Sequence, residues 1–175
     1  LLSPRLQLSL KPRWKKDIIF RTAAGIYSQP PFYREMRDLN GTVNFNLKAQ
    51  KSFHAVAGLD YNFKAFGNRP FKFTSELYYK YMWDLVPYEY DNVRIRYFGE
   101  NQARGYAYGV EGRLYGDIVK DAESWVSIGV MKTEEDINGD KAIIKSRLTG
   151  EDSATVSPGY IPRPTDSRVS FGLFF

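Results

Sequence analysis

The stretch FHAVAGLDYNFKAFGNRPFKFTSELYYKYMW, residues 53–83, decides the fold of this chain. Apolar and polar residues alternate along it, first over residues 53–63 and again over residues 71–81. Because successive side chains of a strand point to opposite faces, a period of two gives one apolar face and one polar face. The Gly-Asn-Arg-Pro sequence at 67–70 separates the two runs, so we expect a β-hairpin with its turn there.

The two strands of this hairpin are unusually long. We expect them to extend over residues 50–64 and 71–84, whereas strands of soluble proteins cluster near five or six residues. A tilted strand that crosses a bilayer needs about nine to eleven residues. The length therefore favours membrane-crossing strands, although a soluble up-and-down barrel with its apolar face inward has the same alternation.

The composition excludes several classes of protein. The chain of 175 residues has no Cys, which excludes disulfides, thiolate catalysis and Cys-ligated metals. Mean hydropathy is −0.45 and no run of eighteen apolar residues exists, so no transmembrane helix is expected. A transmembrane β-barrel needs only alternation. The net charge is +5, but basic residues are mixed with acidic ones, and we predict no nucleic-acid partner.

Further alternating runs lie on both sides of the hairpin. Their apolar positions fall in residues 6–10, 18–26, 106–114, 126–130 and 169–175. Each run predicts one more strand, and consecutive strands joined directly form a meander. We therefore predict an all-β fold, an antiparallel meander of about seven long strands that is part of a large transmembrane β-barrel.

The connections between these strands alternate in length. Short turns are expected at 12–16, 67–70 and 116–122, and long connections at 28–41, 87–101 and 133–162. Alternate connections of an antiparallel meander lie at opposite ends of the sheet, so all long loops should share one end. Outer-membrane barrels have this asymmetry, with tight periplasmic turns and long extracellular loops.

Within the long connections we expect little regular structure. A short helix over 32–39, an early start of the next strand at 43–47 and a few extended residues at 93–97 are expected. Glu134, Asp136, Asn138 and Gly139 resemble the first half of a calcium loop. Lys145 stands where such a loop needs its last carboxylate, so we interpret the segment as a solvated acidic turn and predict no metal site.

Aromatic residues near the strand ends resemble the interface girdles of membrane barrels. They are Trp14, Tyr27, Trp83, Tyr88 and Trp125. The predicted apolar faces carry charge only near the loop ends, at Lys51, Arg104 and Lys132. Both features favour a lipid-facing wall.

The opposite, polar face carries the charges that a water-filled lumen tolerates. They include Arg21, Asp60, Glu76, Lys80, Glu111 and Arg113. We expect these groups to pair with one another rather than to catalyse acid–base chemistry. His54, the one histidine, should be a hydrogen-bonded lumen residue, because nothing local supplies a nucleophile. We predict that the protein is not an enzyme and has no cofactor.

The long loops are the expected ligand-binding surface, because binding residues concentrate on loops that a rigid scaffold holds. Their aromatic and basic residues are Tyr33, Arg34, Tyr88, Tyr90, Arg94, Arg96 and Tyr97. These side chains suit contacts with a sugar, a peptide or a chelate, and equally suit contacts with anionic lipid head groups.

Six motifs, in order, resemble the C-terminal barrel half of TonB-dependent outer-membrane receptors. They are PRLQLSLKP (4–12), FRTAAGIYSQPPFYREM (20–36), QKSFHAVAGLDYNF (50–63), ELYYKYMWDLVP (76–87), ARGYAYGVEGRL (103–114) and PRPTDSRVSFGLFF (162–175). The resemblance implies a 22-stranded barrel with a plugged lumen, of which about seven strands form roughly a third. The chain begins Leu-Leu-Ser-Pro and ends within an alternating run, so we expect a piece of a longer polypeptide.

The resemblance also implies a function and partners. We expect part of a receptor in the cell outer membrane that imports a nutrient, with a small-molecule, glycan or chelate ligand. Its partners would be outer-membrane lipid, the plug domain and remaining barrel strands of the same polypeptide, and the TonB complex through parts outside this sequence. The polar face would contact the plug. Two alternatives stay open: a structural or adhesive outer-membrane barrel without transport, and a soluble all-β ligand-binding domain.

Overall fold

The computed structural model describes residues 2–118, 122–145 and 152–175, and this part of the chain is built from β-strands without a helix. The strands are β1 (Arg5–Leu10), β2 (Asp17–Gln29), β3 (Gln50–Ala65), β4 (Arg69–Leu85), β5 (Tyr88–Asp91), β6 (Arg94–Tyr97), β7 (Ala103–Gly116), β8 (Ser124–Ile137), β9 (Ala142–Lys145), β10 (Asp152–Val156), β11 (Tyr160–Pro162) and β12 (Val169–Phe174). The all-β prediction is confirmed.

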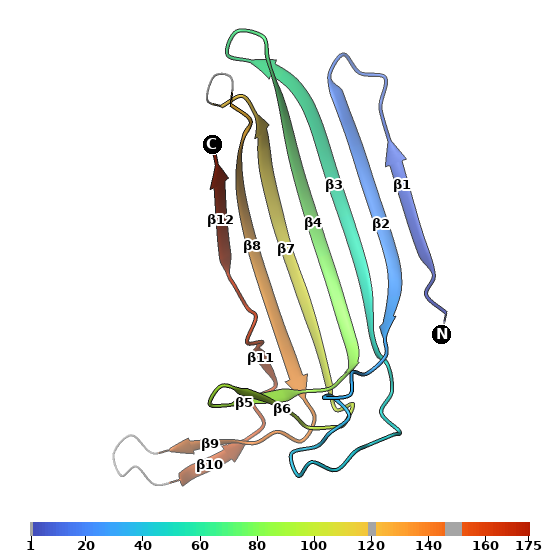
Figure 1. Cartoon of the computed structure of the whole chain (residues 1–175), viewed down its shortest axis with the longest axis vertical. Helices are drawn as coiled ribbons and strands as arrows, with labels where there is room; N and C mark the ends of the chain where they lie inside the picture. Colours follow the sequence, from blue (N-terminus) through green and yellow to red (C-terminus); the bar gives the residue numbers. More distant parts are fainter. Residues whose placement is uncertain (1, 119–121, 146–151) are drawn as a thin grey trace.

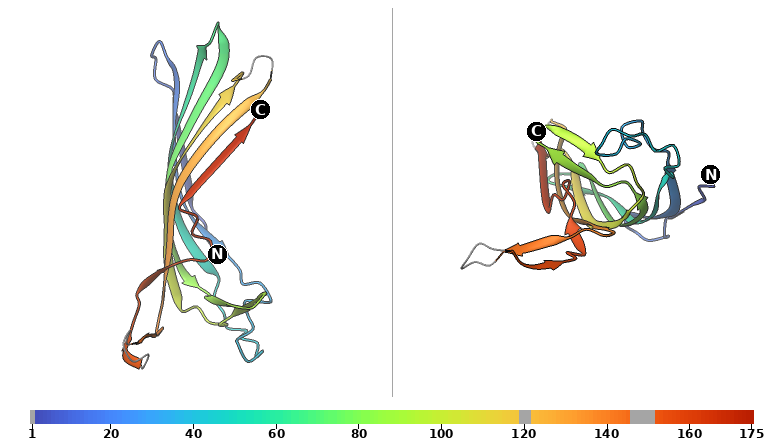
Figure 2. Two further views of the ribbon diagram at one scale, coloured as in Figure 1. Left: turned by 90° about the vertical axis from the view of Figure 1, so that its left-hand side faces the viewer. Right: turned by 90° about the horizontal axis from the view of Figure 1, so that it is seen from below.

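One antiparallel sheet organises the molecule. Its order is β1-β2-β3-β4-β7-β8, and both β11 and β12 pair with the outer side of β8 (Figure 1). The long strands thus follow one another as a meander, and the predicted strands correspond to β1, β2, β3, β4, β7, β8 and β12. The sheet bends into a trough and does not close, so β1 and β12 are its edges (Figure 2).

The two ends of the sheet differ as predicted. The connections 11–16 and 66–68 lie at one end, which we call the turn end, and β7 ends and β8 begins at that same end. The connections 30–49 and 86–102, together with the strands β9 and β10 of the third long connection, lie at the other, the loop end (Figure 1). The hairpin β5–β6 lies within the second long connection, and β9–β10 within the third.

The turn between β3 and β4 is tighter than predicted. It consists of Phe66, Gly67 and Asn68, with φ values of 48°, 82° and 74°. Glycine and asparagine tolerate this left-handed conformation better than other residues do. Arg69 and Pro70 already belong to β4, so the expected Gly-Asn-Arg-Pro turn begins one residue earlier and ends two residues earlier.

The register of the sheet confirms the predicted alternation of faces, because directly paired residues point to the same side. One row across the middle is Thr22, Ala57, Leu77, Val110, Val130 and Val169. The next row toward the turn end is Phe20, Leu59, Ser75, Gly112, Ile128 and Phe171. Neither row contains a charge.

This apolar face is open along its length. Leu77 and Val110 are 60% and 47% exposed in the centre of the sheet, and Phe171 is 66% exposed on β12. Within the described residues no second layer covers the face. The small buried apolar cluster of the chain, Met82, Leu85 and Ala103, lies at the loop end, where Met82 and Leu85 line the opposite, polar side. The apolar residues of the sheet therefore do not form the interior core that a soluble sandwich has.

Aromatic rows border the apolar face at both ends, but their members differ from those expected. The loop-end row is Phe53, Tyr79, Tyr81, Trp83, Tyr106 and Tyr108, and the turn-end row is Tyr61, Phe63, Phe71 and Phe73. Of the predicted girdle residues, Trp83 belongs to a row. Tyr27 and Trp125 lie on the polar face, since they pair with Ser52 and Tyr115, and Tyr88 is in the β5–β6 hairpin.

The first long connection corrects two predictions. No helix forms over 32–39, where one turn is closed by the amides of Glu35 and Met36 donating to the Phe32 carbonyl. The carboxylate of Asp38 then accepts hydrogen bonds from the Asn40 and Thr42 amides, which turns the chain away from a helical path. The segment 43–47 does not start β3, and its one sheet-like contact is an isolated bridge at Val43.

The third long connection starts later than predicted. Residues 133–137 continue β8 instead of forming an acidic turn. The strand tolerates its acidic side chains because basic groups pair with them. Lys132 Nζ lies 2.8 Å from the Glu134 carboxylate, and the guanidinium of Arg163 lies 3.1 Å from that of Glu135. On the neighbouring strand, Arg104 lies 2.8 Å from Asp136.

Candidate functional site

The polar face is the concave side of the trough. The β5–β6 hairpin folds over this side (Figure 2), and its Tyr88 and Tyr97 line a hollow together with His54 and Lys80 of the polar face. Hollows lie along the face in the middle of the sheet and at its loop end. The mid-sheet hollow has a volume of about 620 Å³, and the loop-end hollow one of about 450 Å³.

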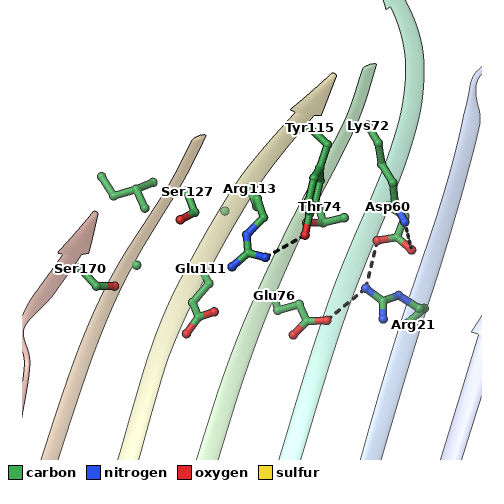
Figure 3. A pocket seen from close by; sticks show the side chains of 13 residues that line it. Arg21, Asp60, Lys72, Thr74, Glu76, Glu111, Arg113, Tyr115, Ser127 and Ser170 are labelled. Carbon is green, nitrogen blue, oxygen red and sulfur yellow. Dashed lines mark hydrogen bonds and ion pairs between the residues drawn. The ribbon is translucent and has the colours of Figure 1, made fainter. Parts of the chain in front are cut away.

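Arg21 organises the mid-sheet hollow (Figure 3). Its Nη2 donates to Asp60 Oδ1 at 3.0 Å and to Glu76 Oε1 at 3.1 Å, which joins β2, β3 and β4. Lys72 Nζ lies 3.8 Å from the other oxygen of Asp60. Gly58 lies between these groups, and a Cβ there would meet Arg21 and Glu76 at 3.5 Å. The expected pairing of charges is thus present on this half of the face.

The other half of the mid-sheet hollow pairs differently. Glu111 lies directly opposite Glu76 in the register, and among the described residues it makes no ion pair. Arg113 Nη1 donates to the Tyr115 hydroxyl at 2.8 Å, and its guanidinium lies 5.1 Å from the ring centre of Trp125. The expectation that Arg113 pairs with a carboxylate is not met in the described part of the chain.

Lys80 lies away from these charges, in the loop-end hollow. It is directly opposite His54 in the β3–β4 register. As expected, His54 is hydrogen-bonded, with Nε2 2.9 Å from Ser52 Oγ, and its ring lies 4.4 Å from that of Tyr27. Lys80 itself has no carboxylate within ion-pair distance among the described residues.

Segments far apart in the sequence close the loop-end hollow. Glu35 comes from the first long connection, Tyr88 and Tyr97 come from β5 and β6, and Arg163 follows β11. Glu35 is buried, with one oxygen accepting from the Phe32 amide at 2.8 Å and the other from Gln50 Nε2 at 2.9 Å. The carboxylate is therefore held in place beside the hollow.

The first two long connections brace each other. The side chain of Asn101 accepts from the Lys48 amide at 2.7 Å and donates to the carbonyls of Lys48 and Asp84 at 3.0 Å and 2.7 Å. Gly99 has a φ of +72° and packs so closely on Asp38 that a Cβ would lie 2.9 Å from its backbone. These contacts fix the loops over the concave face.

Burial raises the pKa of two tyrosines in the β5–β6 hairpin. It raises the pKa of the Tyr88 hydroxyl, and a hydrogen bond with Tyr90 raises it further. Burial, with the negative charge of Glu35, also raises the pKa of Tyr97. Both hydroxyls therefore stay protonated at neutral pH and can donate hydrogen bonds.

The predicted loop residues do not converge on one site. Tyr88 lines the loop-end hollow. Tyr90 packs edge-on against the ring of Tyr88 and is 58% exposed. Arg96 donates to the Leu39 carbonyl and lies 3.6 Å from Asp91, so it is a structural brace.

The remaining loop residues point elsewhere. Arg94 and Arg34 are exposed. Tyr33 accepts a hydrogen bond from Arg37, whose guanidinium lies 4.9 Å from the centre of its ring.

Three residues of the loop-end hollow were not singled out together by the sequence. Glu35 and Arg163 lie in segments without periodicity, and no local signal marks them. Tyr97 was one of several loop aromatics, and its partner Tyr88 is recognisable only once β5 and β6 pair. A search for aromatic residues at the two ends of a short hairpin would have found this pair.

No group of three or more potential metal ligands occurs within the described residues. No helix in that part of the chain has the length and apolar character needed to cross a bilayer. Compared with known proteins, the chain matches no family model and no curated protein.

Proposed function

We propose that the chain forms part of the wall of an outer-membrane β-barrel receptor of the TonB-dependent kind, which imports a nutrient. The observation that carries the proposal is the open apolar face, whose central rows lack charge and which has aromatic rows at both ends. Outer-membrane barrels have such an apolar band with aromatic girdles. The all-β meander with long loops at one end supports the same placement.

The dimensions of the band fit a bilayer. Phe71 and Trp83 are about twelve residues apart on β4, which is roughly 40 Å along an extended strand and roughly 30 Å along the membrane normal at a tilt of about 40°. The hydrocarbon core of a bilayer is about 30 Å thick. Both aromatic rows would then lie at the two lipid–water interfaces.

The charges on the apolar face lie at its two ends. At the turn end Arg69, which is paired with Ala65, donates to the carbonyls of Phe66 and Asp117. The charges at the loop end form ion pairs. Lys51 lies 2.9 Å from Asp84, and the pairs made by Arg104 and Lys132 were described above. Paired charges suit the polar interface, where the cost of a charge is small compared with that at the bilayer centre. The loop end would face outward and the turn end would face the periplasm.

The polar face supports a role in transport rather than in catalysis. It would line the lumen, with the mid-sheet hollow open toward a plug domain of the same polypeptide and the loop-end hollow open toward an arriving ligand. Glu111, which has no ion pair among the described residues, would be available to a basic group of the plug. Energy coupling through TonB would use parts outside this sequence.

The placement of the sheet is tested with cysteines introduced one at a time into the full-length protein, with any cysteine outside this sequence replaced by serine; this sequence itself has none. Leu77→Cys places a thiol on the apolar face and Thr74→Cys places one on the polar face of the same strand. Each is labelled with bimane and the protein is reconstituted with brominated lipids. We expect lipid quenching at position 77 and little at position 74.

The orientation is tested by labelling cells with a membrane-impermeant maleimide. Val93→Cys, at the 96% exposed tip of β5–β6, should react in intact cells, whereas Lys64→Cys at the turn end should react only after permeabilisation.

Equal quenching at positions 74 and 77, or a protein that stays monodisperse without detergent, would refute the membrane placement and favour a soluble ligand-binding domain.

The transport part of the proposal needs its own experiment. The full-length protein in detergent is passed over immobilised TonB C-terminal domain, and we expect specific retention. Retention that fails in a protein whose apolar face is quenched by lipid would favour the structural or adhesive barrel instead.

A further inference from the structure

We propose that the loop-end hollow binds a small ligand made of a hydroxylated ring that carries a carboxylate, with the carboxylate on Lys80 and the ring among Tyr27, Tyr88 and Tyr97. The inference deepens the proposed function, since such a ligand would be the molecule that the receptor recognises.

Lys80 lines this hollow and forms no ion pair within the described residues. The other lysine and the arginine that line the hollow each form an ion pair. Lys51 lies 2.9 Å from Asp84, and Arg163 lies 3.1 Å from Glu135. Lys80 is half-buried on the polar face. A partly desolvated ammonium gains most from a charge-assisted hydrogen bond, so a carboxylate of the ligand is the fitting acceptor.

The tyrosines supply flat surfaces and hydroxyl donors around this cation. The Arg5 guanidinium lies 4.3 Å from the centre of the Tyr27 ring, and the centre of the His54 ring lies 4.4 Å from it. Tyr88 and Tyr97 lie 5.8 Å apart across the β5–β6 hairpin. Aromatic side chains of this kind bury a ring while their hydroxyls bond its polar edge.

Glu35 determines what the ligand must carry besides its carboxylate. Its carboxylate lines the same hollow from the loop side, while Lys80 lines it from the sheet side. The bonds from the Phe32 amide and Gln50 hold it in place. A bare polyanion such as phosphate would be repelled by Glu35, whereas hydroxyl groups on the ligand would donate to it.

The hollow is built in advance of binding. The braces at Asn101 and Gly99 fix both long connections, so little ordering of loops is required when a ligand binds. Its volume of about 450 Å³ falls within the range of roughly 300–1,000 Å³ for small-molecule sites. The site therefore suits a monomeric ring compound or the end group of a longer acidic chain.

Isothermal titration of the full-length protein tests the inference with two acids and their neutral counterparts. Galacturonate is compared with galactose, and 4-hydroxybenzoate with 4-hydroxybenzyl alcohol. We expect at least one acid to bind about tenfold or more tightly than its neutral counterpart. The pair that shows this preference tells a sugar acid from an aromatic acid.

Variants assign the preference to the site. Lys80→Gln should abolish it with about a tenfold loss of affinity, and Lys80→Arg should keep it. Lys64→Gln removes an exposed lysine at the turn end of the same polar face and should bind like the wild type. Retention of the preference in Lys80→Gln, equal binding of acids and neutral compounds, or binding of neither acid would overturn the inference.

The two proposals fail separately. A protein whose position 77 is quenched by lipid but which binds neither acid loses only the ligand. A protein that binds an acid through Lys80 while position 77 stays in water loses only the membrane placement.

Discussion

Placing an arginine at Leu77 gives the sharpest test of the apolar face. Leu77 lies in the central uncharged row, opposite Ala57 and Val110, and is 60% exposed. If the face lies in lipid, an arginine at the bilayer midplane costs about 2–4 kcal/mol. If the face lies in water, an exposed substitution of this kind changes the free energy of unfolding by about 0.5 kcal/mol or less.

The difference is large enough to measure. A loss of 2–4 kcal/mol lowers the folding equilibrium constant roughly thirty- to a thousandfold, because about 1.4 kcal/mol corresponds to a factor of ten. The assay is guanidinium unfolding of the full-length protein in phospholipid vesicles, followed by tryptophan fluorescence. The matched control is Thr74→Arg on the same strand, whose side chain lines the mid-sheet hollow near Asp60 and Glu76. We expect it to cost about 1 kcal/mol or less.

The same unfolding assay also tests how the cost of an arginine depends on its depth in the bilayer. Tyr81 belongs to the loop-end aromatic row and lies four residues from Leu77 along β4. Tyr81→Arg places its charge near the interface, where the penalty from lipid falls to about 0–1 kcal/mol, so Leu77→Arg should be clearly the more destabilising of the two. Equal costs at positions 74, 77 and 81 would refute the assignment of the faces.

Three further substitutions test contacts seen in the structure, each by the same unfolding assay. Arg21→Ala removes the two ion pairs that Arg21 makes in the mid-sheet hollow and should cost about 1–3 kcal/mol, and adding Asp60→Asn should recover part of the loss; no recovery would contradict the pairing. Gly109→Val places a Cβ 2.6 Å from the Tyr78 hydroxyl and should cost about 1–3 kcal/mol, so a neutral result would contradict the packing. Asn101→Ala removes the brace between the long connections and should speed proteolysis within 86–102 without changing the strands, whereas unchanged proteolysis would contradict the bracing role.

The sheet was predictable because its rule is local. An alternation of two along Phe53 to Phe63 specifies which side chains share a face whatever the partner strand is. Short turns specify which strands are neighbours. The observed pairing of Leu77 with Val110 keeps the apolar faces together, and a slip of one residue is excluded because it would turn a whole strand over.

Two predictions from the sequence were wrong because contacts made in the folded chain outweighed the local sequence pattern. Residues 133–137 are mostly acidic and show no apolar alternation, yet they extend β8 because Arg104, Lys132 and Arg163 neutralise them. The expected helix over 32–39 loses to side-chain hydrogen bonds. Asp38 binds the nearby backbone amides of Asn40 and Thr42, an alternative that short polar side chains commonly offer to a helix.

The candidate ligand site was the least predictable part. The alternation placed Lys80 and His54 on one face, but it gave no reason to connect them with Glu35 or Arg163. Those contacts depend on how the long connections fold back, and loops carry no periodic signal. Arg96 illustrates the converse, since its charge suggested a ligand contact while its guanidinium holds Leu39 and Asp91 in place.

The sheet edges place a further demand on the proposed membrane position. β1 and β12 each have one partner strand, so the amides and carbonyls along their outer sides are unpaired within the described residues. In hydrocarbon each unsatisfied backbone group costs several kcal/mol, and an edge strand of ordinary length presents several. The total would exceed the stability of about 5–15 kcal/mol that a folded domain has. A wall that lies in lipid therefore requires further strands at both edges, and the open trough is stable there only as part of a closed barrel.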